Sequence, residues 1–349
     1  MEVDHCIAPS YAELRPLKPR HTDTFPVYDH LVDRLLDADT YPDDDVAFVM
    51  AVCSAYAYSD AATVAMIMTR LGLEKNHCLM VSEYVDALLL TSASFLVQSE
   101  DGRVVILCYR GTPPTSAITW LTDLAVDPVK IKVPAPTGPD EYVHGGFYRN
   151  VRSTRYALET ALTQAIEGRS VLPDAAAMPN RLQALYITGH SLGGASAAML
   201  ATMLLTEPAF QGIAGKLKAV YTYGAPMIGS PEFADACNDH EFLRRKMIRY
   251  VYESDIVPQL PPRESGPFRH FGVEYQYKRV GRHYDWHHNR QPRRQLRSLL
   301  ALAATPLSFL ARQIRVTREI PFHASINDHL PQYYIDKLTP PHARSEFGD

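Results

Sequence analysis

A serine in a G-x-S-x-G turn is the feature of this sequence that is best suited to chemistry. The pentapeptide Gly189-His-Ser-Leu-Gly193 follows a short apolar run and precedes a long run rich in alanine and leucine. This pattern predicts a nucleophile elbow, in which a strand ends, a sharp turn lifts a serine clear of the sheet, and a helix begins. Both glycines are needed because the strand and the incoming helix approach each other closely there. We therefore expect Ser191 to be a nucleophile.

A serine hydroxyl needs a base that removes its proton and an acid that orients this base. In α/β-hydrolases these residues follow in the order serine, aspartate or glutamate, histidine. Asp255 is the favoured acid because it comes just after a predicted strand and before a turn enforced by Pro258. The carboxyl edge of a parallel sheet is where such sites assemble. Glu253 and Asp235 remain as alternatives, the first within the predicted strand and the second within a predicted helix.

Fourteen histidines compete for the role of base. His329 is favoured because it comes late in the chain, follows the turn-forming pair Asn327-Asp328 and leads into a short predicted helix. The histidines that remain as alternatives are His323, His283, His287 and His288.

A metal site is the other chemistry that the histidines suggest. His283 and His287 would lie one turn apart in a helix, with Asp285 close to both. No further ligand with suitable spacing is present, so a solvated polar helix start is the favoured interpretation. The chain has five cysteines, odd in number and mostly in apolar runs, which indicates buried free thiols. We expect no metal and no organic cofactor.

Ester or amide hydrolysis also needs donors aimed at the oxyanion of the tetrahedral intermediate. The backbone N–H of Leu192, which follows the serine, is one expected donor. A second is expected where a predicted strand ends in Arg110-Gly111-Thr112 and the chain must turn sharply. There the Thr112 backbone N–H, together with its hydroxyl, would face the reacting carbonyl.

The elements that must position these residues alternate between helix and strand. The sequence predicts helices over 45–59, 60–71 and 145–166, and strands over 82–89, 93–99, 104–109, 182–188, 217–223 and 246–253. A hairpin turn at Glu100-Asp-Gly102 joins two of these strands. The pattern predicts an α/β fold with a doubly wound, mostly parallel central sheet, an antiparallel N-terminal part and flanking helices.

Several motifs occur together along residues 80–338. In chain order they are Arg110-Gly-Thr, Trp120-Leu-Thr-Asp-Leu, Val143-His-Gly-Gly-Phe-Tyr, Gly189-His-Ser-Leu-Gly-Gly, Tyr223-Gly-Ala-Pro, Asp255-Ile-Val-Pro and Asp328-His. This set resembles the class 3 lipases, the fungal-type triacylglycerol lipases and their bacterial relatives. The resemblance implies an α/β-hydrolase fold, a triad of Ser191, Asp255 and His329, and an oxyanion hole at Thr112 and Leu192. The chain departs from the secreted fungal pattern in lacking an evident disulfide set and in carrying a long segment, 281–320.

The resemblance implies a serine carboxylic ester hydrolase that acts on acylglycerols or other lipid esters through an acyl-enzyme. A phospholipase A1 or a short-chain or feruloyl esterase on the same site is the near alternative, because the pocket sets the substrate. A hydrolase-fold binding protein without turnover is the rival of another class, and the intact serine, aspartate and histidine argue against it. The expected partner is a lipid or small ester substrate, and no obligate protein partner is evident.

Two segments are candidates for contact with a lipid surface. The stretch after the predicted oxyanion strand occupies the position of a lid, and its apolar residues at helical spacing are Ile118, Trp120, Leu121 and Leu124. Residues 290–318 combine arginines with an apolar run that is too short to span a membrane and is broken by Pro306. Packing of the first segment on the core and a soluble cap formed by the second are the alternatives.

Bulk properties bound the remaining possibilities. The net charge of -4 provides no basic field for phosphate backbones, so no nucleic-acid partner is expected. Residues 1–26 contain several prolines and are predicted to form an arm with little structure of its own, without a continuous apolar stretch typical of a secretory signal. We therefore expect either a cytoplasmic protein or a mature secreted form. Residues 27–349 are predicted to form a single domain, with a cap insertion at 281–320.

Overall fold

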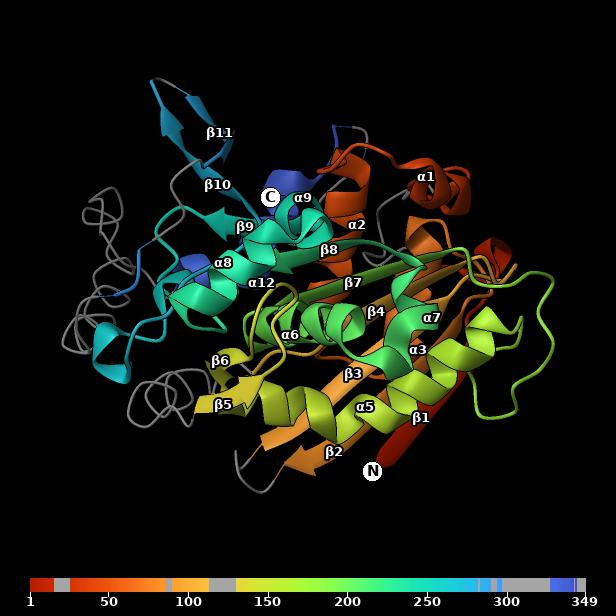
Figure 1. Ribbon diagram of the computed structural model, residues 1–349. Coiled ribbons are helices and arrows are strands. Elements are labelled where there is room, and N and C mark those ends of the chain that lie inside the picture. The colour runs from red at the N-terminus through yellow and green to blue at the C-terminus, as the bar shows by residue number, and fades with distance from the viewer. Residues whose placement is uncertain are drawn as a thin grey trace.

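A central nine-stranded sheet, flanked by helices, forms the body of the molecule (Figure 1). The computed structural model describes residues 1–15, 26–85, 90–112, 130–281, 283–289, 294–296, 327–341 and 343. The strands are β1 (Glu2–Ile7), β2 (His77–Val85), β3 (Leu90–Gln98), β4 (Val104–Tyr109), β5 (Lys130–Val133), β6 (Glu141–His144), β7 (Ala184–His190), β8 (Leu217–Tyr223), β9 (Met247–Tyr252), β10 (Val273–Val280) and β11 (His283–His288). Strands β5 and β6 form a separate two-stranded sheet.

The helices are α1 (Leu31–Asp37), α2 (Asp44–Tyr56), α3 (Ala61–Leu71), α5 (Gly145–Ile166), α6 (Leu192–Thr206), α7 (Gln211–Ala214), α8 (Pro231–Asp239), α9 (Glu241–Lys246) and α12 (Pro331–Leu338). Short 3₁₀ turns include η5 (Arg263–Ser265) and η6 (Asn327–His329). Helix α3 shows how the sequence sets a boundary: the Asp60 carboxylate accepts from Thr63 N at its start, and Gly72 closes its end with φ of 138°. Aspartate is among the residues favoured at a helix N-cap, and glycine is favoured just after a helix end.

The order of the large sheet is β1-β2-β3-β4-β7-β8-β9-β10-β11. Strands β4, β7, β8, β9 and β10 run parallel, whereas β1, β2 and β3 join one edge antiparallel and β11 joins the other edge antiparallel. The predicted α/β fold, with a parallel centre and an antiparallel N-terminal part, is confirmed. Its consequence for the site is that the carboxyl ends of five parallel strands meet at one edge.

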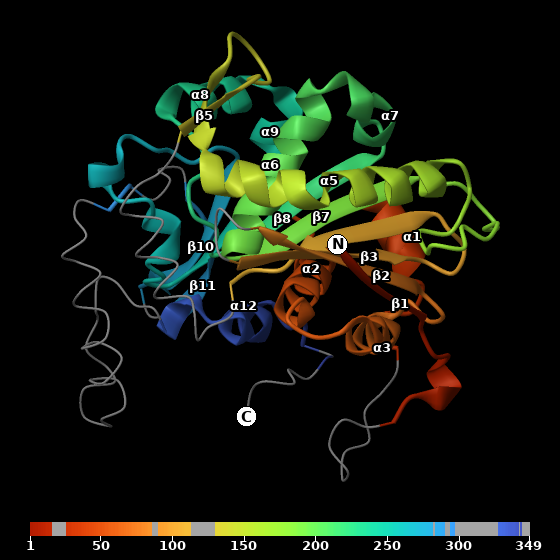
Figure 2. The ribbon, with the colours of Figure 1, turned by 90° about the horizontal axis from the view of Figure 1, so that it is seen from below.

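Helices cover both faces of the sheet, so there are two apolar cores (Figure 2). Helices α5, α6, α7, α8 and α9 lie on one face and α2, α3 and α12 on the other. Alternate residues of each central strand point into the two cores: Val105 and Leu107 of β4 join the first, Ile106 and Cys108 the second. This arrangement explains why the central strands are continuous apolar runs.

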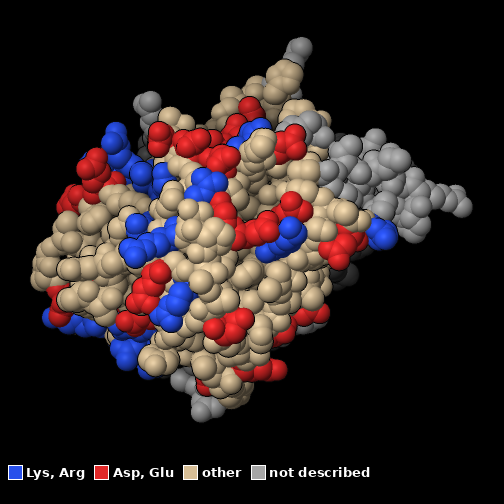
Figure 3. Space-filling view, turned by 90° about the vertical axis from the view of Figure 1, so that its right-hand side faces the viewer, with Lys and Arg blue, Asp and Glu red and all other residues tan. Residues whose placement is uncertain are grey.

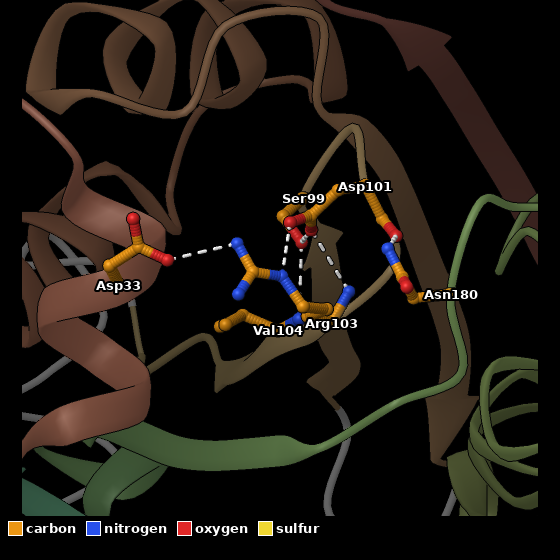
Figure 4. A network of polar contacts seen from close by, with 6 residues as sticks. All are labelled: Asp33, Ser99, Asp101, Arg103, Val104 and Asn180. Atoms are coloured by element: carbon orange, nitrogen blue, oxygen red, sulfur yellow. Dashed lines mark hydrogen bonds and ion pairs between the residues drawn. The ribbon is translucent and has the colours of Figure 1, made fainter.

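The predicted hairpin turn between β3 and β4 is present and carries a polar network (Figure 4). Asp101 Oδ1 accepts from Ser99 Oγ at 2.6 Å and from Arg103 N at 3.0 Å, while Gly102 has φ of 83°. Arg103 then reaches Asp33 of α1 at 3.0 Å, and Asn180 donates to the Asp101 carbonyl at 3.0 Å. The network fixes the amino end of β4, a strand that leads to the predicted oxyanion loop.

Three predictions about elements were wrong. Residues 2–7 were assigned to an arm with little structure, but they form β1, whose pairing is set by the exposed edge of β2. The second error is the start of β2, at His77 rather than at residue 82. The third concerns residues 283–288, which form a strand rather than a helix start, because they pair along β10.

The two candidate lipid-contact segments lie largely outside the described residues. Ile118 and Trp120 fall within 113–129, and of residues 290–318 only 294–296 are described. Within the part of the chain that the structure describes, no helix combines the length and apolar character needed to cross a membrane.

Candidate active site

The nucleophile elbow predicted from the sequence is present between β7 and α6. Ser191 has φ of 60° and ψ of -129°, a backbone conformation that residues with a side chain rarely adopt. Its N–H donates to the carbonyl of Tyr223, at the end of neighbouring β8, at 2.9 Å. A Cβ at Gly189 would overlap the backbone of Gly193, and a Cβ at Gly193 would overlap the carbonyl of Tyr109. The glycines of the motif are therefore required by close approach of strand and helix.

Asp255 and His329 form a buried pair. His329 Nδ1 lies 2.9 Å from Asp255 Oδ2, and the two side chains are 8% and 0% exposed. Asp255 follows the end of β9, and His329 ends the turn η6 just before α12. Because a carboxylate can only accept, Nδ1 of neutral His329 carries the proton and leaves Nε2 free to act as a base.

Tyr334 of α12 is a second donor to the same carboxylate, and sequence reasoning missed it. Its hydroxyl donates to Asp255 Oδ2 at 2.6 Å and accepts from Tyr252 N at 3.1 Å. Val257 N donates to the other oxygen, Oδ1, at 2.9 Å. The buried carboxylate thus accepts three hydrogen bonds, which offset the cost of removing it from water. The only sequence signal for Tyr334 is its place five residues after His329, in the short helix predicted there.

Gly224 connects the elbow to the acid–base pair. It follows Tyr223, whose carbonyl holds the Ser191 N–H, and it has φ of 58°. A Cβ at this position would lie 2.6 Å from Asp255 Oδ2 and 2.9 Å from His329 Nδ1. The carboxyl end of β8 therefore touches both Ser191 and the pair, and only glycine leaves room for this contact.

His190 also holds His329 beside the elbow. The two rings lie 4.4 Å apart between centroids, and His190 Nε2 is 2.6 Å from the His329 carbonyl oxygen. Tyr58 OH lies 3.4 Å from His190 Nδ1. Burial, and then the nearby His329, hold the pKa of His190 well below its ordinary value. A neutral His190 whose Nε2–H donates to the carbonyl satisfies these contacts, so its role is to position His329.

Asp328, which directly precedes His329 in the turn η6, is also held by a hydrogen bond. Its Oδ2 accepts from Ser254 N at 3.0 Å, which ties η6 to the loop that carries Asp255. The sequence singled out Asp328 only as a turn-forming residue. Among the described residues no hydrogen bond joins the Ser191 hydroxyl to the His329 ring. The two residues are linked through Tyr223 with Gly224 and through His190.

The alternatives considered for acid and base lie elsewhere. Asp235 sits on α8 and pairs with Arg269. Glu253 lies just beyond the end of β9 rather than inside the strand, with φ of 33°. The histidines at 283, 287 and 288 belong to the edge strand β11, and His323 is outside the described residues.

The segment predicted to supply the second oxyanion donor packs against the elbow. A Cβ at Gly111 would lie 3.3 Å from Ser191 Cβ and would overlap the hydroxyl of Tyr58. Thr112 is buried, and its Oγ1 has no hydrogen-bond partner among the described residues. Leu192, the first residue of α6, is also buried. Leu192 directly follows Ser191 in the chain, and Thr112 directly follows Gly111, the residue that packs against Ser191.

In the described ranges no three side chains of histidine, cysteine, aspartate or glutamate are grouped as a metal site. The five cysteines, Cys6, Cys53, Cys78, Cys108 and Cys237, are free thiols, four of them buried.

A parallel sheet with an elbow serine, and a buried aspartate and histidine after later strands, defines an α/β-hydrolase. Residues 106–265 match the sequence model of the lipase (class 3) family. The chain is 30% identical over 188 residues to a lipase of Rhizomucor miehei, and 26% identical over 211 residues to the triacylglycerol lipase OBL1 of Ricinus communis. The matched part of this chain is therefore similar to the class 3 lipases.

These matches cover 54% and 51% of the present chain, but only 46% and 39% of the two relatives. A solved triacylglycerol lipase, described as having a serine-protease triad at its catalytic centre, superposes with a TM-score of 0.54. The superposition covers 83% of this chain and 94% of the other, at 20% identity, and it establishes the likeness of fold.

Proposed function

We propose that this chain is a serine ester hydrolase that acts on acylglycerols or other lipid esters. The observation that carries the proposal is the buried pair of Asp255 and His329, held against the strained elbow of Ser191 by Gly224 and His190. A desolvated aspartate–imidazole pair next to a serine on a strained turn is the arrangement that activates a hydroxyl. The names of the relatives, lipase and triacylglycerol lipase, support lipid esters as the substrate class.

In the proposed reaction the Ser191 hydroxyl attacks the ester carbonyl carbon. His329 Nε2 takes the hydroxyl proton, and Asp255 stabilises the imidazolium through the hydrogen bond at Nδ1. The same imidazolium gives its proton to the leaving alcohol, which produces an acyl-enzyme. Water, deprotonated by His329, then releases the acid and restores Ser191.

The oxyanion of both tetrahedral intermediates needs donors that are already in place. We assign this role to the backbone N–H groups of Thr112 and Leu192, with the Thr112 hydroxyl as an additional donor. The buried and unpartnered Thr112 Oγ1 supports the assignment, because a hydroxyl in this state gains a hydrogen bond when the oxyanion forms. Removal of one such donor costs about 10²–10³ in kcat in a comparable hydrolase.

The test is a hydrolysis profile over p-nitrophenyl esters of increasing acyl length, run beside a triacylglycerol emulsion and a phospholipid. The wild-type chain is expected to hydrolyse the esters and the emulsion, and His329→Ala and Asp255→Asn are expected to lose roughly 10⁴-fold or more in kcat. Asp235→Asn is the matched control, since it makes the same change at a carboxylate away from the site. Equal rates for Asp255→Asn and Asp235→Asn would overturn the assignment of the acid.

A further inference from the structure

A cavity of about 670 Å³ lies where the loop between β9 and β10 meets the start of α8. Its size falls within the range of small-molecule pockets. Three arginines line it, Arg263, Arg269 and Arg294, together with the apolar side chains of Pro231, Pro267 and Phe268. Asp255 begins the same loop but is not part of this lining. The cavity is therefore distinct from the buried acid–base pair.

The charge around the cavity is predominantly positive. Arg269 pairs with Asp235 and donates to the Pro231 carbonyl at 2.5 Å. Arg263 and Arg294 form no ion pair with any carboxylate of the described residues. Lys130 of β5 does not line the cavity either, and its Nζ lies 5.9 Å from the centre of the Phe268 ring. The neighbouring carboxylates Glu232 and Glu264 are not among the residues that line the cavity.

The wall of the cavity is fixed by hydrogen bonds. Gln295 Nε2 donates to the carbonyls of Pro261 at 2.9 Å and Gly266 at 2.7 Å, and Gln295 Oε1 accepts from Phe268 N at 3.2 Å. Leu296 is joined to the loop twice, through Gln259 O at 2.8 Å and Arg263 N at 2.9 Å. Arg263 and Arg294 are therefore presented by backbone that is already ordered, which lowers the entropy cost of binding.

We propose that this cavity binds the phosphate group of an amphiphile. Guanidinium groups bond phosphate oxygens in pairs, and a phosphate has enough oxygens to engage two arginines, whereas a carboxylate has only two oxygens to share. The proline and phenylalanine walls then bury the apolar part next to the phosphate. The inference goes beyond the proposed function, and it rests on that function only in taking a lipid as the amphiphile.

The charge on another side of the molecule differs from that of the cavity. On the face shown in Figure 3, Lys and Arg alternate with Asp and Glu, and no field of a single sign extends over it. Binding of an anion to that face would be non-specific and weak. Arginines outside the cavity can therefore be replaced as controls, because their replacement leaves the cavity lining unchanged.

Isothermal titration calorimetry on the full chain tests the proposal. The titration uses Ser191→Ala, so that no hydrolysis consumes the ligand, and dihexanoyl phosphatidate below its aggregation concentration, with inorganic phosphate as a second ligand. Adding Arg263→Gln with Arg294→Gln is expected to weaken phosphatidate binding about tenfold or more, equivalent to about 1.4 kcal/mol. Adding Arg181→Gln with Arg244→Gln makes the same change of net charge at exposed positions and is expected to leave binding unchanged.

A third variant, Arg263→Lys with Arg294→Lys, keeps the positive charge but loses the forked geometry of the guanidinium groups. A phosphatidate affinity between those of the glutamine variant and its control would support paired hydrogen bonds from arginine to phosphate. Equal binding by the glutamine variant and its control, or no binding by either ligand, would overturn the proposal. Inorganic phosphate that binds as tightly as phosphatidate would overturn its amphiphile part. Because heat is measured without turnover, a wild-type chain that hydrolyses no ester would refute the proposed function and leave this result standing.

Discussion

Tyr334 illustrates what a single residue adds at the candidate site. Its hydroxyl is shared between the Asp255 carboxylate and the backbone of β9, so it fixes the carboxylate on the strand from which the loop departs. Tyr333, the preceding residue, stacks on Tyr252 with ring centroids 5.3 Å apart and does not contact the carboxylate. The two tyrosines therefore form a natural pair of test and control.

We expect Tyr334→Phe to lower kcat on a soluble ester about tenfold, with little change in KM. The reason is that a hydrogen bond to a charged group is worth about 1.5–3 kcal/mol, and Asp255 needs it most when the imidazolium forms. Steady-state kinetics with Tyr333→Phe as the control measure the effect. The same kcat for the two variants would show that the Tyr334 hydroxyl serves packing only.

His190 leads to a prediction about pH. Burial holds its pKa below the unfolded value of about 6.5, so below pH 6.5 the unfolded chain binds a proton that the folded chain does not. Stability is therefore full above pH 6.5 and is lost as the pH falls toward the folded pKa, by at most about 1.4 kcal/mol per pH unit. In His190→Gln, which keeps an N–H donor but does not titrate, this part of the loss should vanish.

Urea unfolding at pH 7.5, 6.5 and 5.5 provides the measurement, because the difference between variant and wild type isolates His190 from the other histidines. His5→Gln, at an exposed position on β1, is the control and should keep the wild-type dependence. Parallel curves for the wild type and His190→Gln would contradict the prediction.

At the scale of single residues, the sequence predicted those whose chemistry is tied to a local pattern. Ser191, with its two glycines, is such a case, because the sterics of the elbow require that pattern within five residues. Asp255 and His329 were predicted by chain order and turn context, and the structure pairs them. Tyr334 and the positioning role of His190 were not predictable, because a hydroxyl or a ring contact across the chain leaves no local pattern.

Among the elements, β9 and β10 are joined by a buried ion pair. Arg249 and Glu274 face each other in the parallel register, with Nη1 and Oε2 2.9 Å apart and the side chains 5% and 0% exposed. Asn289 Nδ2 donates to the second oxygen of Glu274 at 2.7 Å, and Arg249 Nε donates to Phe271 O at 2.8 Å. Burial lowers the pKa of Arg249, although the carboxylate opposes this effect.

We expect Glu274→Gln to lower the free energy of unfolding by about 3–5 kcal/mol, because the Arg249 charge would stay buried without a counter-charge. Glu241→Gln, which removes an exposed partner of Arg245, should change it by no more than about 0.5 kcal/mol. Chemical denaturation compares the two. Similar midpoints for both variants would show that the buried pair contributes no more than a surface pair.

The sequence predicted elements well where strands and helices are long and buried, as in β4, β7, β8 and α5. It failed at the edges of the sheet. Strand β1 is almost fully exposed, and β11 is polar and rich in histidine, so neither carries the apolar pattern of a buried strand. Their pairing depends on an available neighbouring edge, which is a tertiary property.

The whole molecule brings together residues that are far apart in the chain. Ser191, Asp255 and His329 come from three segments. The backbone of Ser191 and the Asp255–His329 pair both adjoin the carboxyl end of β8, because β7, β8 and β9 run parallel and end at one edge of the sheet. The two cores hold these strands from both faces, so the positions of their ends are set by the fold as a whole. We propose that this convergence makes the Ser191 hydroxyl reactive.

Covalent labelling by a fluorophosphonate measures the reactivity of this hydroxyl. Mass spectrometry of the intact chain and its peptides should find one label in the wild type, on Ser191, and none in Ser191→Ala. His329→Ala should react at least about 100-fold more slowly, because it lacks the general base. A label on any other residue, or an unchanged rate for His329→Ala, would contradict activation of Ser191 by His329.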